Sequence, residues 1–336
     1  MGLAVWLTCQ SPALGGCNGL QSSVLIDSGR QSVARKEYDK AAAAFQRAWE
    51  ACPEQQAVLL ELVQSLTLQR KFEEATRAAN QFLASDPNSE QGLVVLANVH
   101  FMAQRFADCQ KIVARVLEAN NRNLVALKLK ANAHYLAGEE PQAVETFLGL
   151  IAVDPGNEDA IYSLGRIYYQ QNRFQPAIAQ FQRVLELNPK SYKTYDNLGL
   201  CYEALNQDET AIRHYLKALD LVHKNHPEYE WPYANLSNLL LKRGEIEKAF
   251  QLAAEAAQRN PASARSFYLA GKALLRLEKL ELAAKWLSQA VELDATYPEP
   301  HYLLGQVYQK LGRKEEAERA FQRFQEINEK TARRRR

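Results

Sequence analysis

Few side chains in this sequence have the types and spacing that catalysis or metal binding requires. His223 and His226 are three residues apart, with Glu228 and Glu230 close by, and two imidazoles with carboxylates are donors that a zinc ion accepts. A longer surface loop over the segment 222–230 explains the same residues more simply. We therefore predict no bound metal and no cofactor.

The other residues with reactive side chains are explained by packing. Cys109 and Cys201 lie among apolar residues at helical spacing, which is typical of small core residues. His100 and His134 occupy a position that tyrosine fills elsewhere in the chain, which indicates packing between helices. No Ser/His/Asp arrangement, glycine-rich phosphate loop or paired-carboxylate motif stands out. The sequence predicts that the protein is not an enzyme.

Composition and charge narrow the class of protein further. Of the 336 residues, 47% are hydrophobic, which is ample material for a core, and no apolar run reaches the length of about 18 residues that indicates a membrane-spanning helix. The net charge is +2, and the arginines from Arg333 to Arg336 supply the excess, so we expect no nucleic-acid partner. The five cysteines show no paired spacing, which argues against a disulfide framework.

The chain repeats itself with a period of 34 residues, and one interval is lengthened to 38. Prolines mark the period at Pro53, Pro87, Pro155, Pro189, Pro227 and Pro261. A second column holds Ala41, Ala75, Cys109, Ala143, Ala177, Ala211, Ala249, Ala283 and Ala317. A third, twelve residues earlier, is mostly glycine or alanine. Small residues at two fixed points of each unit indicate two helices that approach closely, so each unit is predicted to be a helical hairpin.

The unit resembles the tetratricopeptide repeat. The fifth unit shows the pattern best, with Leu164-Gly165, Tyr168, Ala177, Phe181 and Pro189. The resemblance covers nine units over residues 20–329, with the four-residue insertion near 222–230. It implies an all-α fold, a right-handed superhelical solenoid of antiparallel helix pairs, in which the first helices line a concave groove.

In this family the groove-facing residues lie at fixed offsets in the first helices. Here these positions hold Lys128, Asn132, Tyr162, Arg166, Tyr169, Lys193, Asp196, Trp231, Asn235, Asn238, Arg265, Tyr268, Lys272 and Tyr302. Tyrosine and tryptophan bury large areas at low entropic cost and keep a polar group. The resemblance therefore implies a non-catalytic scaffold whose groove binds a peptide or a helix of a partner protein.

Some members of the family bind a C-terminal carboxylate with a clamp of two lysines, two asparagines and an arginine. Lys128, Asn132 and Lys193 match three of these positions. Ser163 and Asn197 replace the remaining asparagine and the arginine, and loss of the bidentate guanidinium weakens carboxylate recognition. A hydrated polar groove is the simpler interpretation.

The two ends depart from the repeat. The apolar segment 1–7, followed by Ala13-Leu14-Gly15-Gly16-Cys17, resembles a bacterial lipobox, which gives residues 1–19 as a leader or lipoprotein-type signal with Cys17 as its lipidation site. The alternative function is then an envelope lipoprotein that assists assembly of a secretion, pilus or polysaccharide machine. The missing basic start and the polar residues 8–12 weaken this signal, and the alternatives are a truncated or misassigned start or a flexible leader. The protein is thus expected to be cytoplasmic or, with a lipid on Cys17, periplasmic and membrane-anchored; residues 330–336 form a basic tail.

Overall fold

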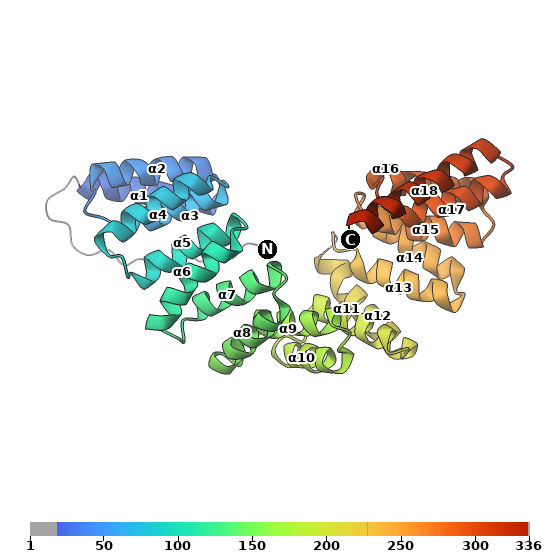
Figure 1. Cartoon of the computed structure of the whole chain (residues 1–336), viewed down its shortest axis with the longest axis horizontal. Helices are drawn as coiled ribbons and strands as arrows, with labels where there is room; N and C mark the ends of the chain where they lie inside the picture. The colour runs from blue at the N-terminus through green and yellow to red at the C-terminus, as the bar shows by residue number, and fades with distance from the viewer. Residues whose placement is uncertain (1–18, 227, 335–336) are drawn as a thin grey trace. The chain divides into compact units, whose positions relative to one another are not determined.

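The computed structural model describes residues 19–226 and 228–334. In these residues the chain is all helical, and none of its helices is long and apolar enough to cross a membrane. The eighteen helices (Figure 1) are α1 (Gly19–Ala34), α2 (Tyr38–Ala51), α3 (Ala57–Leu68), α4 (Phe72–Ser85), α5 (Glu90–Met102), α6 (Phe106–Ala119), α7 (Leu124–Leu136), α8 (Glu140–Val153), α9 (Glu158–Gln170), α10 (Phe174–Leu187), α11 (Tyr192–Ala204), α12 (Asp208–Asn225), α13 (Trp231–Arg243), α14 (Ile246–Arg259), α15 (Ala264–Arg276), α16 (Leu280–Leu293), α17 (Pro298–Lys310) and α18 (Lys314–Arg334).

The chain divides into two compact units, Met1–Leu164 and Gly165–Arg336, with the boundary inside α9. Within each unit, consecutive helices pack as antiparallel pairs, such as α1 with α2 in unit 1 and α11 with α12 in unit 2 (Figure 1). The first helices of successive pairs also contact one another: α3 with α5 and α5 with α7 in unit 1, and α11, α13, α15 and α17 in order in unit 2. The predicted all-α solenoid of antiparallel helix pairs is therefore confirmed.

The columns of small residues let the two helices of a pair come close together. Gly199 in α11 faces the buried ring of Tyr215 in α12, and a Cβ atom at position 199 would lie 2.4 Å from Cε1 of Tyr215. Gly165 meets Phe181 in the same way, with a corresponding distance of 2.8 Å. The alanine column is fully buried at Ala41, Ala75, Ala143, Ala177, Ala211, Ala249 and Ala283. The close approach expected from the sequence is confirmed.

Each helical hairpin turns through one residue with a positive φ. These residues are Lys36, Arg70, Gln104, Gly138, Asn172, Asn206, Gly244, Glu278 and Gly312. Most of them carry a side chain, for which the left-handed conformation costs about 1 kcal/mol or more. The packing of the two helices, more than the preference of the turn residue, must therefore hold these turns.

The insertion between the sixth and seventh repeats is mainly helical, which differs from the surface loop suggested by the sequence. Helix α12 has 18 residues, whereas α10 and α14 have 14 each. The chain then returns to α13 across α11, because the rings of His226 and Tyr229 lie 4.3 Å and 4.8 Å from the ring of Tyr192. The inserted residues thus add to the helix and bring aromatic side chains onto the start of α11.

The ends and the cysteines add three observations. Helix α18 runs on to Arg334, so most of the segment expected as a basic tail is helical. The predicted lipidation site Cys17 and its leader lie outside the described residues. Cys109 and Cys201 are buried free thiols, whereas Cys52 is disulfide-bonded.

Candidate functional site

The reactive side chains of the described residues are engaged in packing. Burial raises the pKa of both Cys109 and Cys201 to about 12, so these thiols stay protonated and are poor nucleophiles. Nδ1 of His223 lies 3.2 Å from a guanidinium nitrogen of Arg259, and His226 stacks on Tyr192. No group of three histidine, cysteine or acidic side chains in the described ranges could hold a metal ion.

Three predicted groove residues form a hydrogen-bonded chain across three first helices of unit 2. Nδ2 of Asn235 in α13 donates to Oδ1 of Asp196 in α11 at 2.9 Å, and Nη2 of Arg265 in α15 donates to Oδ1 of Asn235 at 2.9 Å. Asp196 and Asn235 are only 3% and 4% exposed. This chain, the first rung, fixes these side chains before any partner arrives.

The carboxyl group of Asp196 is the most unusual titratable group on this face. Burial raises its pKa to about 7, although hydrogen bonds from Asn235 and Tyr229 and the charge of Arg265 act in the opposite direction. The nearby carboxylate of Glu230 adds to the rise. An acid that is partly protonated at neutral pH, inside a polar row, is the kind of perturbed group that marks functional surfaces.

A second polar rung lies further along the same helices, two turns on in α11 and α13 and three turns on in α15. Nζ of Lys242 in α13 is 2.7 Å from Oε1 of Glu203 in α11, and the hydroxyl of Tyr215 donates to the other carboxylate oxygen at 2.9 Å. Nη1 of Arg276 in α15 donates to the carbonyl of Leu241 at 2.6 Å. Acidic side chains thus stand on α11 and cations on α13 and α15.

Aromatic rings alternate with the cations near these rungs. Trp231, the first residue of α13, is 47% exposed, and the Arg265 guanidinium carbon lies 5.6 Å from its ring centroid. The ring of Tyr268 lies 5.3 Å from that of Tyr297, and Nζ of Lys272 lies 5.7 Å from the Tyr268 ring. Such cation–aromatic contacts keep large rings at the surface, where they are able to bury area against a partner.

Three of the predicted groove residues lie in unit 1 instead. Nζ of Lys128 is ion-paired with Oδ2 of Asp159 at 2.6 Å, and Nδ2 of Asn132 donates to the carbonyl of Lys128 at 2.7 Å. Tyr162 is half-buried in α9. Because the charge of Lys128 is already balanced, the partial carboxylate clamp inferred from the sequence has lost one of its cations to an internal partner.

The remaining predicted groove residues of unit 2 belong to neither polar rung. Arg166 is exposed, and the half-buried Tyr169 packs with its ring centroid 5.8 Å from that of Phe174. Nζ of Lys193 lies 5.8 Å from the ring of Tyr192, and Asn238 is half-buried on α13. Tyr302 packs onto α18, with its ring 5.2 Å from that of Phe324.

Sequence reasoning missed four residues that complete the face: Tyr229, Glu203, Lys242 and Arg276. A signal for two of them was present, because Lys242 and Arg276 are 34 residues apart and close their first helices at the same repeat position. Tyr229 belongs to the insertion, which no repeat column describes. Its hydrogen bond to Asp196 therefore had no sequence signal.

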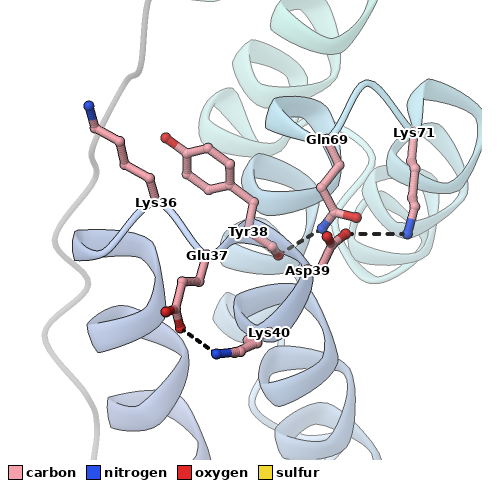
Figure 2. Close-up of a pocket in the computed structure, with 7 residues that line it drawn as sticks. All are labelled: Lys36, Glu37, Tyr38, Asp39, Lys40, Gln69 and Lys71. Atoms are coloured by element: carbon pink, nitrogen blue, oxygen red, sulfur yellow. Dashed lines mark hydrogen bonds and ion pairs between the residues drawn. The ribbon is translucent and has the colours of Figure 1, made fainter.

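Unit 1 has a pocket of about 480 Å³ at the turns that follow α1 and α3. It is lined by Lys36, Glu37, Tyr38, Asp39, Lys40, Gln69 and Lys71 (Figure 2). Its carboxylates face lysines of the same pocket, since Glu37 is 3.0 Å from Nζ of Lys40 and Asp39 is 3.9 Å from Nζ of Lys71. Because both carboxylates of this pocket are already paired with lysines, it is a weaker candidate than the face of unit 2.

Comparisons with known proteins agree with the repeat. Models of the tetratricopeptide repeat match residues 158–191, 191–260 and 298–331, and a TPR repeat model matches residues 271–312. No curated protein matches the chain in sequence.

Several solved structures share the fold. The APC/C hetero-tetramer Cut9–Hcn1 has a chain with 17% identity and a TM-score of 0.59, and the match covers 86% of this chain and 57% of that one, so this chain spans little more than half of that protein. A tetratricopeptide repeat protein from Parabacteroides merdae has 16% identity and a TM-score of 0.54, and the match covers 86% of this chain and 99% of that one. The pilF protein of Pseudomonas aeruginosa has 20% identity and a TM-score of 0.55, and the match covers 65% of this chain and 97% of that one. Likeness at these identities concerns the fold alone. With its repeated columns, its paired helices and these matches, the chain is a tetratricopeptide repeat protein.

Proposed function

We propose that the protein is a non-catalytic scaffold that holds a segment of a partner protein on the face shared by α11, α13 and α15. The observation that supports this most is the first rung, Asp196–Asn235–Arg265, which orders polar side chains of three successive helices without a ligand. Side chains that are already ordered lose less conformational entropy on binding, so more of the contact energy appears as affinity. The family to which the chain belongs is one of protein-binding scaffolds that usually lack catalytic activity.

The groups on this face suit a peptide chain. A guanidinium has five N–H donors, and the hydrogen bond from Arg265 to Asn235 engages one nitrogen, which leaves donors for a carbonyl or carboxylate of a bound segment. Trp231 beside Arg265 and Tyr268 beside Lys272 supply apolar area at the shared face. The combination of aromatic anchors with pre-ordered polar groups is typical of residues that dominate binding energy at interfaces.

Site-specific photocrosslinking in the native cells tests this function. A photoreactive amino acid replaces Trp231 on the proposed face, and the same substitution at Leu216 on α12, which is 51% exposed, serves as the control. We expect a discrete crosslinked partner at position 231 and none at position 216. Equal crosslinking at the two positions, or none at position 231, would contradict the placement of the binding face.

A further inference from the structure

Three cations follow one another along the exposed edge of α15. Arg265, Lys272 and Arg276 are seven and four residues apart, a spacing that puts them on one face of the helix. Arg265 and Arg276 both reach α13, through Asn235 and through the carbonyl of Leu241. We call these three residues the α15 cation row; it borders the face that carries both polar rungs.

The groups in direct hydrogen-bond or ring contact with the α15 cation row are uncharged. Arg265 contacts an amide and an indole, Arg276 a backbone carbonyl and Lys272 the ring of Tyr268. Within residues 19–226 and 228–334, none of the three takes part in an ion pair within 4.0 Å. Burial lowers the pKa of Lys272, and the charges of Arg276 and Lys242 lower it further, while the charge of Glu299 on α17 opposes them. A half-buried cation among like charges is costly unless an anion joins it.

Some other cations of unit 2 do have a carboxylate partner. At the hairpin turns, Arg243 is ion-paired with Glu209 at 2.6 Å, and Arg313 with Glu281 at 2.9 Å. Among the acids of the neighbouring first helices, Glu203 binds Lys242 and Tyr215. Glu299 on α17 acts on Lys272 through its charge, without an ion pair within 4.0 Å in the described residues. Asp196 is occupied in the first rung and buried. Within residues 19–226 and 228–334, the α15 cation row therefore has no ion-paired carboxylate.

We propose that the α15 cation row receives the acidic side chains of an extended segment of a partner protein. The proposal rests on the proposed function and names the chemistry of the bound segment. Carboxylates of the segment replace the missing anion, and a guanidinium binds a carboxylate through two parallel hydrogen bonds. Along the helix axis, Arg265 and Lys272 are separated by about 10 Å and Lys272 and Arg276 by about 6 Å, so more than one carboxylate fits the row. Apolar or aromatic side chains of the same segment lie on Trp231 and Tyr268, which flank the row.

Fluorescence anisotropy with a defined set of labelled peptides tests the proposal. The peptides share leucine and phenylalanine and differ only at the intervening positions, which hold glutamate, glutamine or lysine. At low salt we expect the glutamate peptide to bind the full chain about tenfold more tightly than the glutamine peptide, with a smaller difference at high salt because ions screen the charges. The variant Lys272→Gln with Arg276→Gln should lose this preference. The matched control, Lys285→Gln with Lys314→Gln, removes the same charge from exposed positions on α16 and α18 and should keep it.

Each outcome decides a specific point, provided that circular dichroism shows unchanged helicity. The proposal that the α15 cation row binds an acidic segment is overturned by either of two results. One is equal affinity for the glutamate and glutamine peptides, and the other is an unchanged preference for glutamate in the Lys272 and Arg276 variant. If such charge-independent binding still falls in Trp231→Ala, the proposed function stands without this inference. If no peptide binds, whatever its charge, both fail. Tighter binding of a short single-stranded DNA than of the glutamate peptide would also overturn the proposal, because the α15 cation row would then bind phosphate groups in preference to carboxylates.

Discussion

Replacing Asp196 with asparagine should stabilise the protein, and more so at high pH. The side chain keeps its shape and its Oδ1 acceptor for Asn235, while the ionisable group disappears. In the wild-type protein, burial raises the pKa of Asp196 from 3.8 to about 7, so the folded state binds a proton more readily than the unfolded state. The free energy of unfolding therefore falls as pH rises through the window between these two values, and the cost is complete above the folded-state pKa.

The size of the effect follows from the two pKa values. A shift from 3.8 to about 7 corresponds to about 4 kcal/mol between fully protonated and fully ionised carboxyl groups. At pH 5 the wild-type protein already carries the part of this cost that builds up between the unfolded-state pKa of 3.8 and pH 5. The advantage of Asp196→Asn should therefore grow by about 3 kcal/mol between pH 5 and pH 8.

Urea unfolding followed by helical circular dichroism, repeated over this pH range, measures the difference. Asp220→Asn is the matched control, because the side chain of Asp220 is 70% exposed on α12 and its replacement should change the free energy of unfolding only slightly. A constant difference between Asp196→Asn and wild type over the range would refute the reasoning, because the carboxyl group would then be as well solvated in the folded state as in the unfolded chain.

Three further substitutions test the packing and the charges. Gly199→Ala should lower the free energy of unfolding by about 1–3 kcal/mol, since its Cβ would press on the buried ring of Tyr215, and a thermal melt that matches wild type would contradict this close approach. Gly149→Ala on α8, where no atom lies within 4 Å of the added Cβ, should instead raise stability by about 0.5–1 kcal/mol in the same melt. Lys272→Met should raise the melting temperature, because it removes a half-buried charge near other cations, and it should also weaken the binding of the glutamate peptide. A lower melting temperature would mean that the charge of Lys272 stabilises the folded state.

The repeat columns predicted the helix pairs because one physical requirement recurs in every unit. Gly199 and Tyr215 illustrate this: a residue without a side chain faces a ring sixteen positions later, and the same offset relates Gly165 to Phe181. A requirement that recurs at a fixed period can be read from one sequence. For that reason the all-helical fold of antiparallel helix pairs was predictable.

The contacts of the candidate site were less predictable, since they depend on pairs that occur once. Asn235 and Asp196 were each expected at the groove, but their hydrogen bond spans the insertion, which shifts the register of the repeat. Lys128 was predicted to face the groove, but its ion pair with Asp159, an exposed acid of the next first helix, was not predicted. Position in a repeat indicates which face a side chain occupies, whereas its partner depends on the neighbour that happens to be within reach.

The left-handed residues of the hairpin turns make the stability of each repeat separately adjustable. Lys36, Arg70, Gln104 and Glu278 have φ values of 60°, 63°, 61° and 57°, and each adopts a conformation that glycine enters at no steric cost. A single glycine at one of these turns would strengthen one hairpin and leave the side chains of α11, α13 and α15 untouched. Because neighbouring repeats support one another in an array, such variants would reveal where unfolding begins along the chain and how far it spreads.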